Sequence, residues 1–81
     1  MDNRREERKK AKHWLEDATD VEYTQFVAMA KLTPQQKEIL DLVILQGMYQ
    51  YEVSEELAMS KSKIKRICAR IYDRVIKLKK F

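Results

Sequence analysis

Residues 50 to 75 read QYEVSEELAMSKSKIKRICARIYDRV, and this stretch decides the fold. Its apolar spacing predicts a short helix from about Gln50 to Ala58, followed by a brief turn at Ala58 and Met59. Ser60 is placed to cap a third and longer helix that continues to the end of the chain. The short helix shows acidic side chains and the long one shows basic side chains, so the two are expected to have different roles.

The helix that precedes this stretch has the clearest boundaries in the chain. Thr33, Pro34 and Gln36 predict its start, as an N-cap, a proline in the first helical position and a capping-box partner. Gly47, the only glycine, predicts its end just after Gln46. A helix, a short helix, a turn and a basic helix follow one another in the order of a helix-turn-helix unit.

Composition favours an all-α chain with one small core. The 81 residues include one Gly and one Pro, and 44% are apolar, whereas sheets need more turn residues and disorder needs fewer apolar ones. The expected fold is a small helical bundle containing a helix-turn-helix with a long C-terminal recognition helix. One His and one Cys cannot form a closed zinc site or an internal disulfide, so we expect no metal and no cofactor. We also expect neither a signal peptide nor a membrane span.

Charge divides the chain into blocks with net charges of +3 for residues 1–13, −7 for 14–60 and +8 for 61–81. Residues 1–13 are expected to be a basic arm, either disordered without a partner or a frayed helical extension. Residues 14–32 are expected to form an N-terminal helical segment, broken near Thr19, where Thr19 and Glu22 suit a capping box. Residues 33–81 are then the helix-turn-helix domain, within one compact domain of 14–81.

The long last helix separates into an apolar side and a basic side when its residues are placed at about 100° intervals. The inward side is predicted to hold Ile64, Ile67, Cys68, Ile71, Val75 and Leu78. The outward side is predicted to hold Ser62, Lys65, Arg66, Ala69, Arg70, Asp73, Lys77 and Lys80, with Lys61 and Lys63 beside its start. Cations at a helix N-terminus cost roughly 0.3 to 1 kcal/mol each, which favours a phosphate partner as the compensation. A solvated Lys-rich face is the alternative.

Each outward residue near the start of this helix has a predicted role if the helix enters a DNA major groove. Arg66 and Arg70 suit bidentate contacts with guanine, and Ala69 suits contact with a thymine methyl group. Lys61 and Lys63 suit phosphate, which fixes the register without reading sequence. Enzyme activity is not expected, because no nucleophile, metal site or glycine-rich phosphate loop accompanies the carboxylates.

Further phosphate contacts are predicted outside the recognition surface. Asp73 would repel phosphate unless Arg70 or Lys77 pairs with it. The basic arm either grips phosphate or the minor groove, or serves as a solubilising tail. The candidate phosphate contacts are Arg4, Arg5, Arg8, Lys9, Lys10 and Arg74.

Other chemically distinctive side chains are interpreted as ordinary structural residues. His13 is expected at the surface, and Cys68 is expected to be an inert core residue. Trp14, Tyr23 and Phe26 are expected to pack. A second group, Tyr72, Ile76 and Phe81, is expected to pack on residues 14–30 or on a second copy of the chain.

The sequence resembles the helix-turn-helix of bacterial sigma factor region four and of LuxR-type regulators. The matching text is LTPQQKEIL at 32–40, Gly47, EVSEELAMSKSKIK at 52–65, and Arg70 with Ile71. Ala58 departs from the family, which commonly has Gly or an aromatic residue there. The resemblance places DNA contacts on Lys61, Ser62, Lys63, Lys65, Arg66 and Arg70.

The expected function is a sequence-specific, double-stranded DNA-binding transcriptional regulator. No room is expected for the separate sigma domain that melts promoters, so the resemblance implies a small stand-alone regulator of phage or plasmid type, cytoplasmic in a bacterial or phage-infected cell. One alternative is an interaction module that binds RNA polymerase or a sigma factor, and another is a phage DNA-packaging protein like the small terminase subunit. A homodimer is a further expectation, and no membrane partner is expected.

Overall fold

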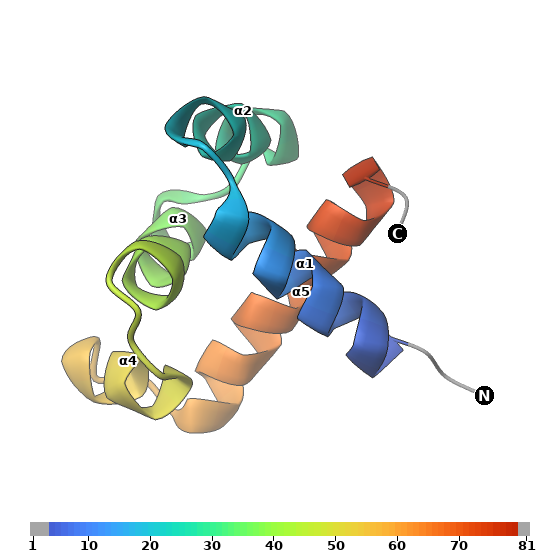
Figure 1. The fold of residues 1–81 in the computed structure, drawn as a ribbon. Helices are drawn as coiled ribbons and strands as arrows, with labels where there is room; N and C mark the ends of the chain where they lie inside the picture. The colour runs from blue at the N-terminus through green and yellow to red at the C-terminus, as the bar shows by residue number, and fades with distance from the viewer. Residues whose placement is uncertain (1–3, 80–81) are drawn as a thin grey trace.

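The computed structural model describes residues 4–79, which form five α-helices and one π-helical segment. The helices are α1 (Arg4–Asp17), α2 (Asp20–Ala30), α3 (Pro34–Leu40), α4 (Gln50–Glu56) and α5 (Lys61–Lys79), and the segment η1 (Asp41–Leu45) continues α3 (Figure 1). No strand occurs within these residues. The predicted all-α class and the order of the helix-turn-helix are therefore confirmed.

Capping residues start two of these helices as the sequence predicts. The Thr19 hydroxyl accepts a hydrogen bond from the Glu22 N–H at 3.2 Å, and the Glu22 carboxylate accepts one from the Thr19 N–H at 2.9 Å. Thr33 and Gln36 repeat this reciprocal pair at 3.1 and 3.0 Å, with Pro34 in the first turn. Each pair satisfies two backbone groups that a helix start leaves without intrahelical partners.

Residues with left-handed backbone follow α2, η1 and α4, and the first of them is Lys31, with φ of 52°. Gly47 follows η1 with φ of 68°, which confirms the predicted glycine stop. Ala58 adopts φ of 53° between α4 and α5, where the turn is predicted and where the resembling families commonly have glycine. The Met59 N–H then donates to the Ser54 carbonyl at 2.9 Å and closes the turn.

The π-helical segment is a feature that the sequence reading did not anticipate. The Gln46 N–H donates to the carbonyl of Asp41, five residues earlier, at 3.1 Å. The Asp41 carboxylate accepts from the Tyr23 hydroxyl at 2.7 Å and from the Lys37 ammonium at 2.8 Å. Asp41 thus ties α2 to the point at which α3 widens into η1.

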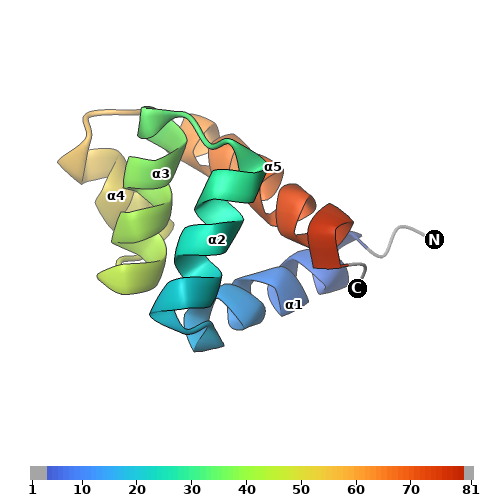
Figure 2. The same ribbon diagram turned by 90° about the horizontal axis from the view of Figure 1, so that it is seen from above.

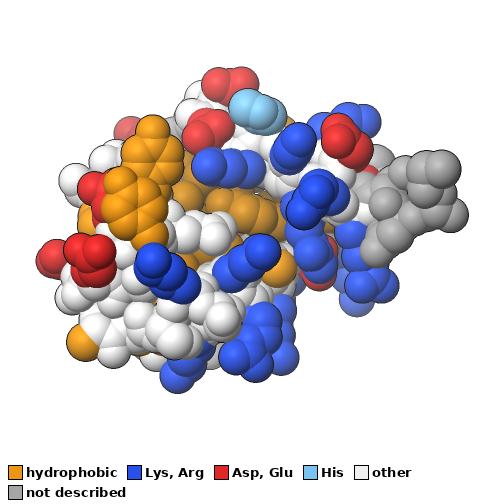
Figure 3. Space-filling view, turned by 90° about the horizontal axis from the view of Figure 1, so that it is seen from below, with side chains coloured by type: hydrophobic (Ala, Val, Ile, Leu, Met, Phe, Trp, Pro, Cys, Tyr) orange, Lys and Arg blue, Asp and Glu red, His pale blue; other side chains and the backbone are white. Residues whose placement is uncertain are grey.

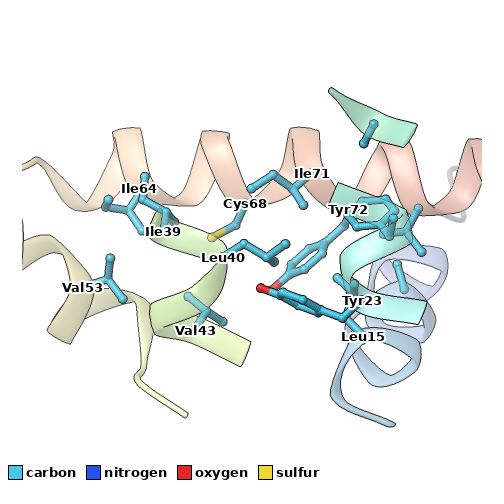
Figure 4. Close-up of a cluster of buried hydrophobic side chains, with 14 residues drawn as sticks. Leu15, Tyr23, Ile39, Leu40, Val43, Val53, Ile64, Cys68, Ile71 and Tyr72 are labelled. Atoms are coloured by element: carbon cyan, nitrogen blue, oxygen red, sulfur yellow. The ribbon is translucent and has the colours of Figure 1, made fainter. Parts of the chain in front are cut away.

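Helix α5 is the shared packing partner of the fold, because all four other helices contact it. Seen from above, α3 and α4 lie at one end of the molecule, and the first turn of α1 and the last turn of α5 lie at the other (Figure 2). The core forms where α5 meets these helices (Figure 4). Its largest fully buried side chains are Leu15, Ile39, Leu40, Val53, Ile64, Ile71 and Val75.

The buried side of α5 is rotated from the predicted one toward Tyr72. Ile64, Cys68, Ile71 and Val75 are buried as predicted, and Ile67 is half-buried. Leu78 is 39% exposed, so its predicted place in the core is wrong. Helix α1 packs on the side of α5 that carries Tyr72, so the core extends to Tyr72. The opposite edge of the apolar side, which carries Leu78, is left partly exposed.

The N-terminal basic segment is a packed helix from Arg4 onward. The expectation of a disordered arm is therefore wrong for residues 4–13. Ala11 and Leu15 of α1 are 0% and 1% exposed, and α1 packs against α5. No break occurs at the expected boundary between residues 13 and 14, which lies inside α1. Ala11 is the one buried residue among residues 4–13, and the burial of so small a side chain is not predictable from a mostly charged segment. Residues 1–3 lie outside the described part of the chain.

The expected packing of the aromatic residues is confirmed for those that the structure describes. Phe26 and Tyr23 are buried, and the Trp14 ring meets Phe26 edge to face with 6.3 Å between centroids. The Lys79 ammonium lies 4.5 Å from the centre of the Trp14 ring. Tyr72 is buried, whereas Phe81 and Lys80 lie outside the described residues. None of the helices of 4–79 combines the length and apolarity needed to cross a bilayer.

Candidate nucleic-acid interface

The predicted recognition residues lie on one helix, α5, and most of them face solvent. Its start is fixed by Ser60, whose hydroxyl accepts a hydrogen bond from the Lys63 N–H at 3.1 Å. The exposed members of the predicted set are Lys61, Ser62, Lys63, Lys65, Arg66 and Arg70. Ala69 is half-buried, and it lies at the side of α5 that faces α1.

The cations in the first half of α5 are not neutralised by carboxylates within residues 4–79. The ion pairs among these residues join Arg8 to Asp73, Lys9 to Glu6, His13 to Glu16 and Lys37 to Asp41. None of these pairs includes a cation between residues 61 and 70. Figure 3 views the molecule from below relative to Figure 1. It shows many Lys and Arg side chains on this face, with Asp and Glu mainly toward its edges. The result is an uncompensated positive surface of the kind that attracts a polyanion.

Helix α4 and the Ala58 turn hold α5 with that surface outward. Val53 is 0% exposed at the contact between α4 and α5, opposite Ile64 on the inner side of α5 (Figure 4). The Ser54 hydroxyl is satisfied by the Tyr51 carbonyl at 2.7 Å, so this buried polar group keeps a partner. A short helix packed on a longer basic helix through a tight turn defines the class as a helix-turn-helix protein.

Comparison with known families shows which family of helix-turn-helix proteins the chain belongs to. The model of the family described as Sigma-70, region 4 matches residues 28–75, from the end of α2 through most of α5. The chain therefore belongs to the sigma-70 region 4 family, whose helix-turn-helix domains bind DNA and interact with RNA polymerase and are not enzymes. No curated protein and no solved structure matches the chain. Helix α1 lies wholly before the matched residues.

Asp73 has a different partner from the two that the sequence suggested. Its carboxylate accepts two hydrogen bonds from the Arg8 guanidinium of α1, at 2.9 and 3.0 Å. The hydrogen bonds from Arg8 lower the pKa of Asp73, and the nearby charges of Arg8 and Arg4 lower it further against the opposing effect of burial. A pairing of Asp73 with Arg70 or Lys77, which the sequence analysis named as the condition for tolerating phosphate nearby, is not among the ion pairs of residues 4–79.

Two of the predicted phosphate contacts form hydrogen bonds that join one helix to another. Arg8 is engaged by Asp73, and the Arg74 guanidinium donates to the Ala30 carbonyl and so joins α5 to the end of α2. Arg5, Lys9 and Lys10 are exposed on α1, as is Arg4. The phosphate contacts of these four residues stay predictions.

Gln50 was missed by sequence reasoning, and Lys12 was included only as part of the basic arm. Both lie beside Lys65 and Ala69 in a cleft between α1, α4 and α5. Lys12 belongs to a segment that gave no sign of docking, and Gln50 is a neutral residue at the start of α4. Both reach toward Cys68, whose pKa burial raises to about 11, with Lys12 and a hydrogen bond from Gln50 acting in the opposite direction. A buried thiol with a raised pKa is a packing residue.

A second feature that the sequence reading missed is a stacked aromatic pair at the start of α4. The rings of Tyr49 and Tyr51 lie 5.8 Å apart and within 8° of parallel. They are 68% and 51% exposed, so this stack is on the surface. Leu45, at the end of η1, is also 59% exposed.

Proposed function

We propose that the chain is a sequence-specific, double-stranded DNA-binding regulator of transcription that reads the major groove with α5. The observation that carries the proposal is the row of exposed cations on the first half of α5, without carboxylate partners among residues 4–79. The family assignment supports DNA as the polyanion, because sigma-70 region 4 domains bind DNA.

The roles within α5 follow from side-chain chemistry and position. Arg66 and Arg70 lie one turn apart on the exposed face, and a guanidinium matches the two acceptors of guanine in the major groove. Lys61 and Lys63 lie at the helix start and suit phosphate, where they set the register. Ala69 is the least accessible member of the predicted set, so its contact with a thymine methyl group requires close approach of the groove.

Binding measured across many sequences tests these roles. A target is first selected from a random duplex pool, and the full chain is then assayed with Arg66→Ala, Arg70→Ala and Lys63→Ala. Loss of one bidentate contact costs about 1 to 3 kcal/mol at one base position, so either Arg variant is expected to lose preference there. Lys63→Ala is expected to weaken all sequences alike and to make the salt dependence shallower by about one unit.

Lys37→Gln is the control, because this substitution also removes one positive charge, but from α3 and not from the exposed cationic face of α5. It is expected to leave binding and preference unchanged. Equal behaviour of the two Arg variants and Lys63→Ala across sequences would contradict the division between base reading and phosphate contact. Absence of duplex binding at low salt would contradict the proposed function itself.

We also infer a second, compatible function for the exposed surface at the start of α4, as a contact surface for RNA polymerase. The Tyr49 and Tyr51 stack is exposed at the start of α4, a helix that also carries Glu52, Glu55 and Glu56, and aromatic residues are enriched at protein interfaces. A Tyr49→Ser and Tyr51→Ser double variant is expected to lose co-purification with purified RNA polymerase while keeping DNA affinity. Retained co-purification would remove this surface from the proposal.

A further inference from the structure

The space between α1, the start of α4 and the side of α5 is a cleft of about 420 Å³. We call it the basic cleft, and five cations line it. Four come from α1 and one from α5: Arg5, Arg8, Lys9, Lys12 and Lys65. The remaining lining residues are Gln50, Ala69 and Tyr72. None of the lining residues that the structure describes is an Asp or a Glu.

Most of the positive charge in the basic cleft has no internal compensation. Arg8 is paired with Asp73, and Lys9 approaches Glu6 only at 3.9 Å, with both side chains largely exposed. Arg5, Lys12 and Lys65 form no ion pair with any residue of 4–79. Bringing α1 against α5 therefore places like charges on both sides of one cleft, an arrangement that repels itself without an anion.

The arrangement of charge on α5 indicates which anion fits. On one side of the helix, Lys63, Arg66 and Arg70 line a shallow groove. On the other side, Lys65 and Ala69 open into the basic cleft. The major groove of DNA is about 12 Å wide and is bounded by a phosphate backbone on each side. A helix that enters it has a row of phosphates along both flanks, so Lys63 on one side of the reading residues Arg66 and Arg70, and Lys65 on the other side, match a duplex.

We propose that the basic cleft binds the phosphate backbone of one DNA strand at the flank of the groove that α5 enters. This inference rests on the proposed DNA-binding function of α5. It assigns to α1, which lies outside the residues matched by the family model, a second set of phosphate contacts made by Arg5, Lys9 and Lys12. Residue Lys65 joins this set to the recognition helix.

The helix that carries the α1 cations is packed against α5 before any ligand arrives. The two hydrogen bonds from Arg8 to Asp73 link α1 to α5, and Ala11 of α1 is fully buried at their contact. A ligand that meets a fixed row of charges loses less conformational freedom of the protein on binding. Arg8 thus positions the neighbouring cations, whereas Arg5 and Lys12 remain exposed for contact.

A small phosphorylated molecule shares the same chemistry, and the lining favours the DNA backbone over it. Gln50 is the one neutral side chain in the lining with an amide that could recognise a base or a sugar. Five cations and no carboxylate among the lining residues suit a repeating row of phosphates. The cleft also opens directly beside the proposed reading surface of α5.

The test compares two double variants of the full chain that remove equal charge. Arg5→Gln with Lys12→Gln empties part of the basic cleft, and Lys31→Gln with Lys37→Gln removes two cations from the acidic middle of the chain. Each is assayed on the selected duplex between about 50 and 200 mM salt, after circular dichroism has shown the helical content and the melting curve. All four positions are exposed, and glutamine retains a good helix propensity at Arg5, Lys12 and Lys37, which are helical.

The cleft variant is expected to bind with a salt slope shallower by about two units, since each lost phosphate contact removes about 0.9. Its affinity at about 100 mM salt is expected to fall roughly ten- to fifty-fold, with unchanged preference among sequences. Arg5→Lys with Lys12→Arg keeps the charge and is expected to restore the slope. The control variant is expected to match the original chain.

Different failures have different meanings. If the cleft variant keeps the original slope and affinity while Arg66→Ala still alters sequence preference, the inference about α1 is wrong and the proposed function stands. If the original chain binds no duplex, both fail. Titration with inorganic pyrophosphate, followed by amide NMR shifts, separates the two phosphate sources. Tight pyrophosphate binding that the cleft variant loses, with an unchanged duplex slope, would assign the cleft to a small ligand and overturn the inference.

Discussion

The contact between Arg8 and Asp73 allows a quantitative test of how α1 is held against α5. A double-mutant cycle of Arg8→Gln and Asp73→Asn removes the ion pair while keeping polar side chains of similar size. The two groups lie 65 positions apart in sequence and are joined by two hydrogen bonds of 2.9 and 3.0 Å. Their coupling energy therefore reports the docking of α1, because no local helix contact contributes to it.

The expected coupling is about 1 kcal/mol near pH 7. Two opposite charges about 4 Å apart attract by about 1 kcal/mol in water and more at a partly desolvated surface. The side chains are 32% and 44% exposed, so solvent screens much of any larger gain. Exposed pairs usually give about 0.2 to 1 kcal/mol, and the bidentate geometry places this pair at the upper end. A loss of that size lowers Tm by about 4 to 8 °C in a domain of this length.

The coupling should depend on pH in one direction. The hydrogen bonds from Arg8 lower the folded-state pKa of Asp73 below its ordinary value of 3.8. A carboxyl group with a lowered folded-state pKa stabilises the protein above its unfolded-state pKa. The contribution is therefore complete above about pH 5 and disappears as pH falls through the lowered pKa.

Urea unfolding of the four proteins of the cycle, at about pH 7 and at steps below about pH 4, measures both properties. The matched control is the cycle of Glu6→Gln and Lys9→Gln, a pair on α1 that is separated by 3.9 Å and is 71% and 65% exposed, respectively. Its coupling is expected to stay below about 0.3 kcal/mol. A value that small for Arg8 and Asp73, or a coupling that does not fall with acid, would refute the proposed anchoring of α1.

Four further outcomes follow from buried or strained positions. Tyr23→Phe removes a 2.7 Å hydrogen bond to the Asp41 carboxylate and should lower the free energy of unfolding by about 1.5 to 3 kcal/mol in urea titrations. Tyr72→Phe should be neutral or stabilising by up to about 1 kcal/mol in the same assay, because the buried Tyr72 hydroxyl has no hydrogen-bond partner within residues 4–79. Gly47→Ala should cost about 1 kcal/mol, as φ is 68° while no atom lies within 4 Å of an added Cβ, and a larger loss would point to a clash. The Cys68 thiol, buried and with its pKa raised to about 11, should react with a thiol reagent near pH 8 only as fast as the chain opens, and rapid reaction of the folded chain would contradict its burial.

Local chemistry explains which parts of the fold were predictable from sequence. Thr33, Pro34 and Gln36 act on backbone groups within one turn of themselves, so their pattern fixed the start of α3. The apolar spacing of α5 likewise fixed most of its buried side, because a helix places residues at regular angles whatever it packs against. These signals need no knowledge of distant segments.

The features that were missed depend on contacts between distant segments. Helix α1 is anchored by Ala11, a small residue with little apolar area, and by Arg8, whose partner Asp73 lies near the other end of the chain. The rotation of the buried side of α5 toward Tyr72 follows from that docking, as does the exposure of Leu78. The basic cleft is missed for the same reason, since Lys12 and Lys65 meet only after α1 has packed on α5.

The use of Asp73 connects the docking of α1 to the charge of α5. Asp73 is the only acidic residue among residues 61–81. Arg70 and Lys77 lie three and four positions away, where a helix brings opposite charges within reach, so a surface built only for solvation would be expected to use this carboxylate locally. The carboxylate instead pairs with Arg8 across the contact with α1. The contact between two basic helices is thereby relieved at one point, while Arg66, Arg70, Lys12 and Lys65 form no ion pair with residues 4–79.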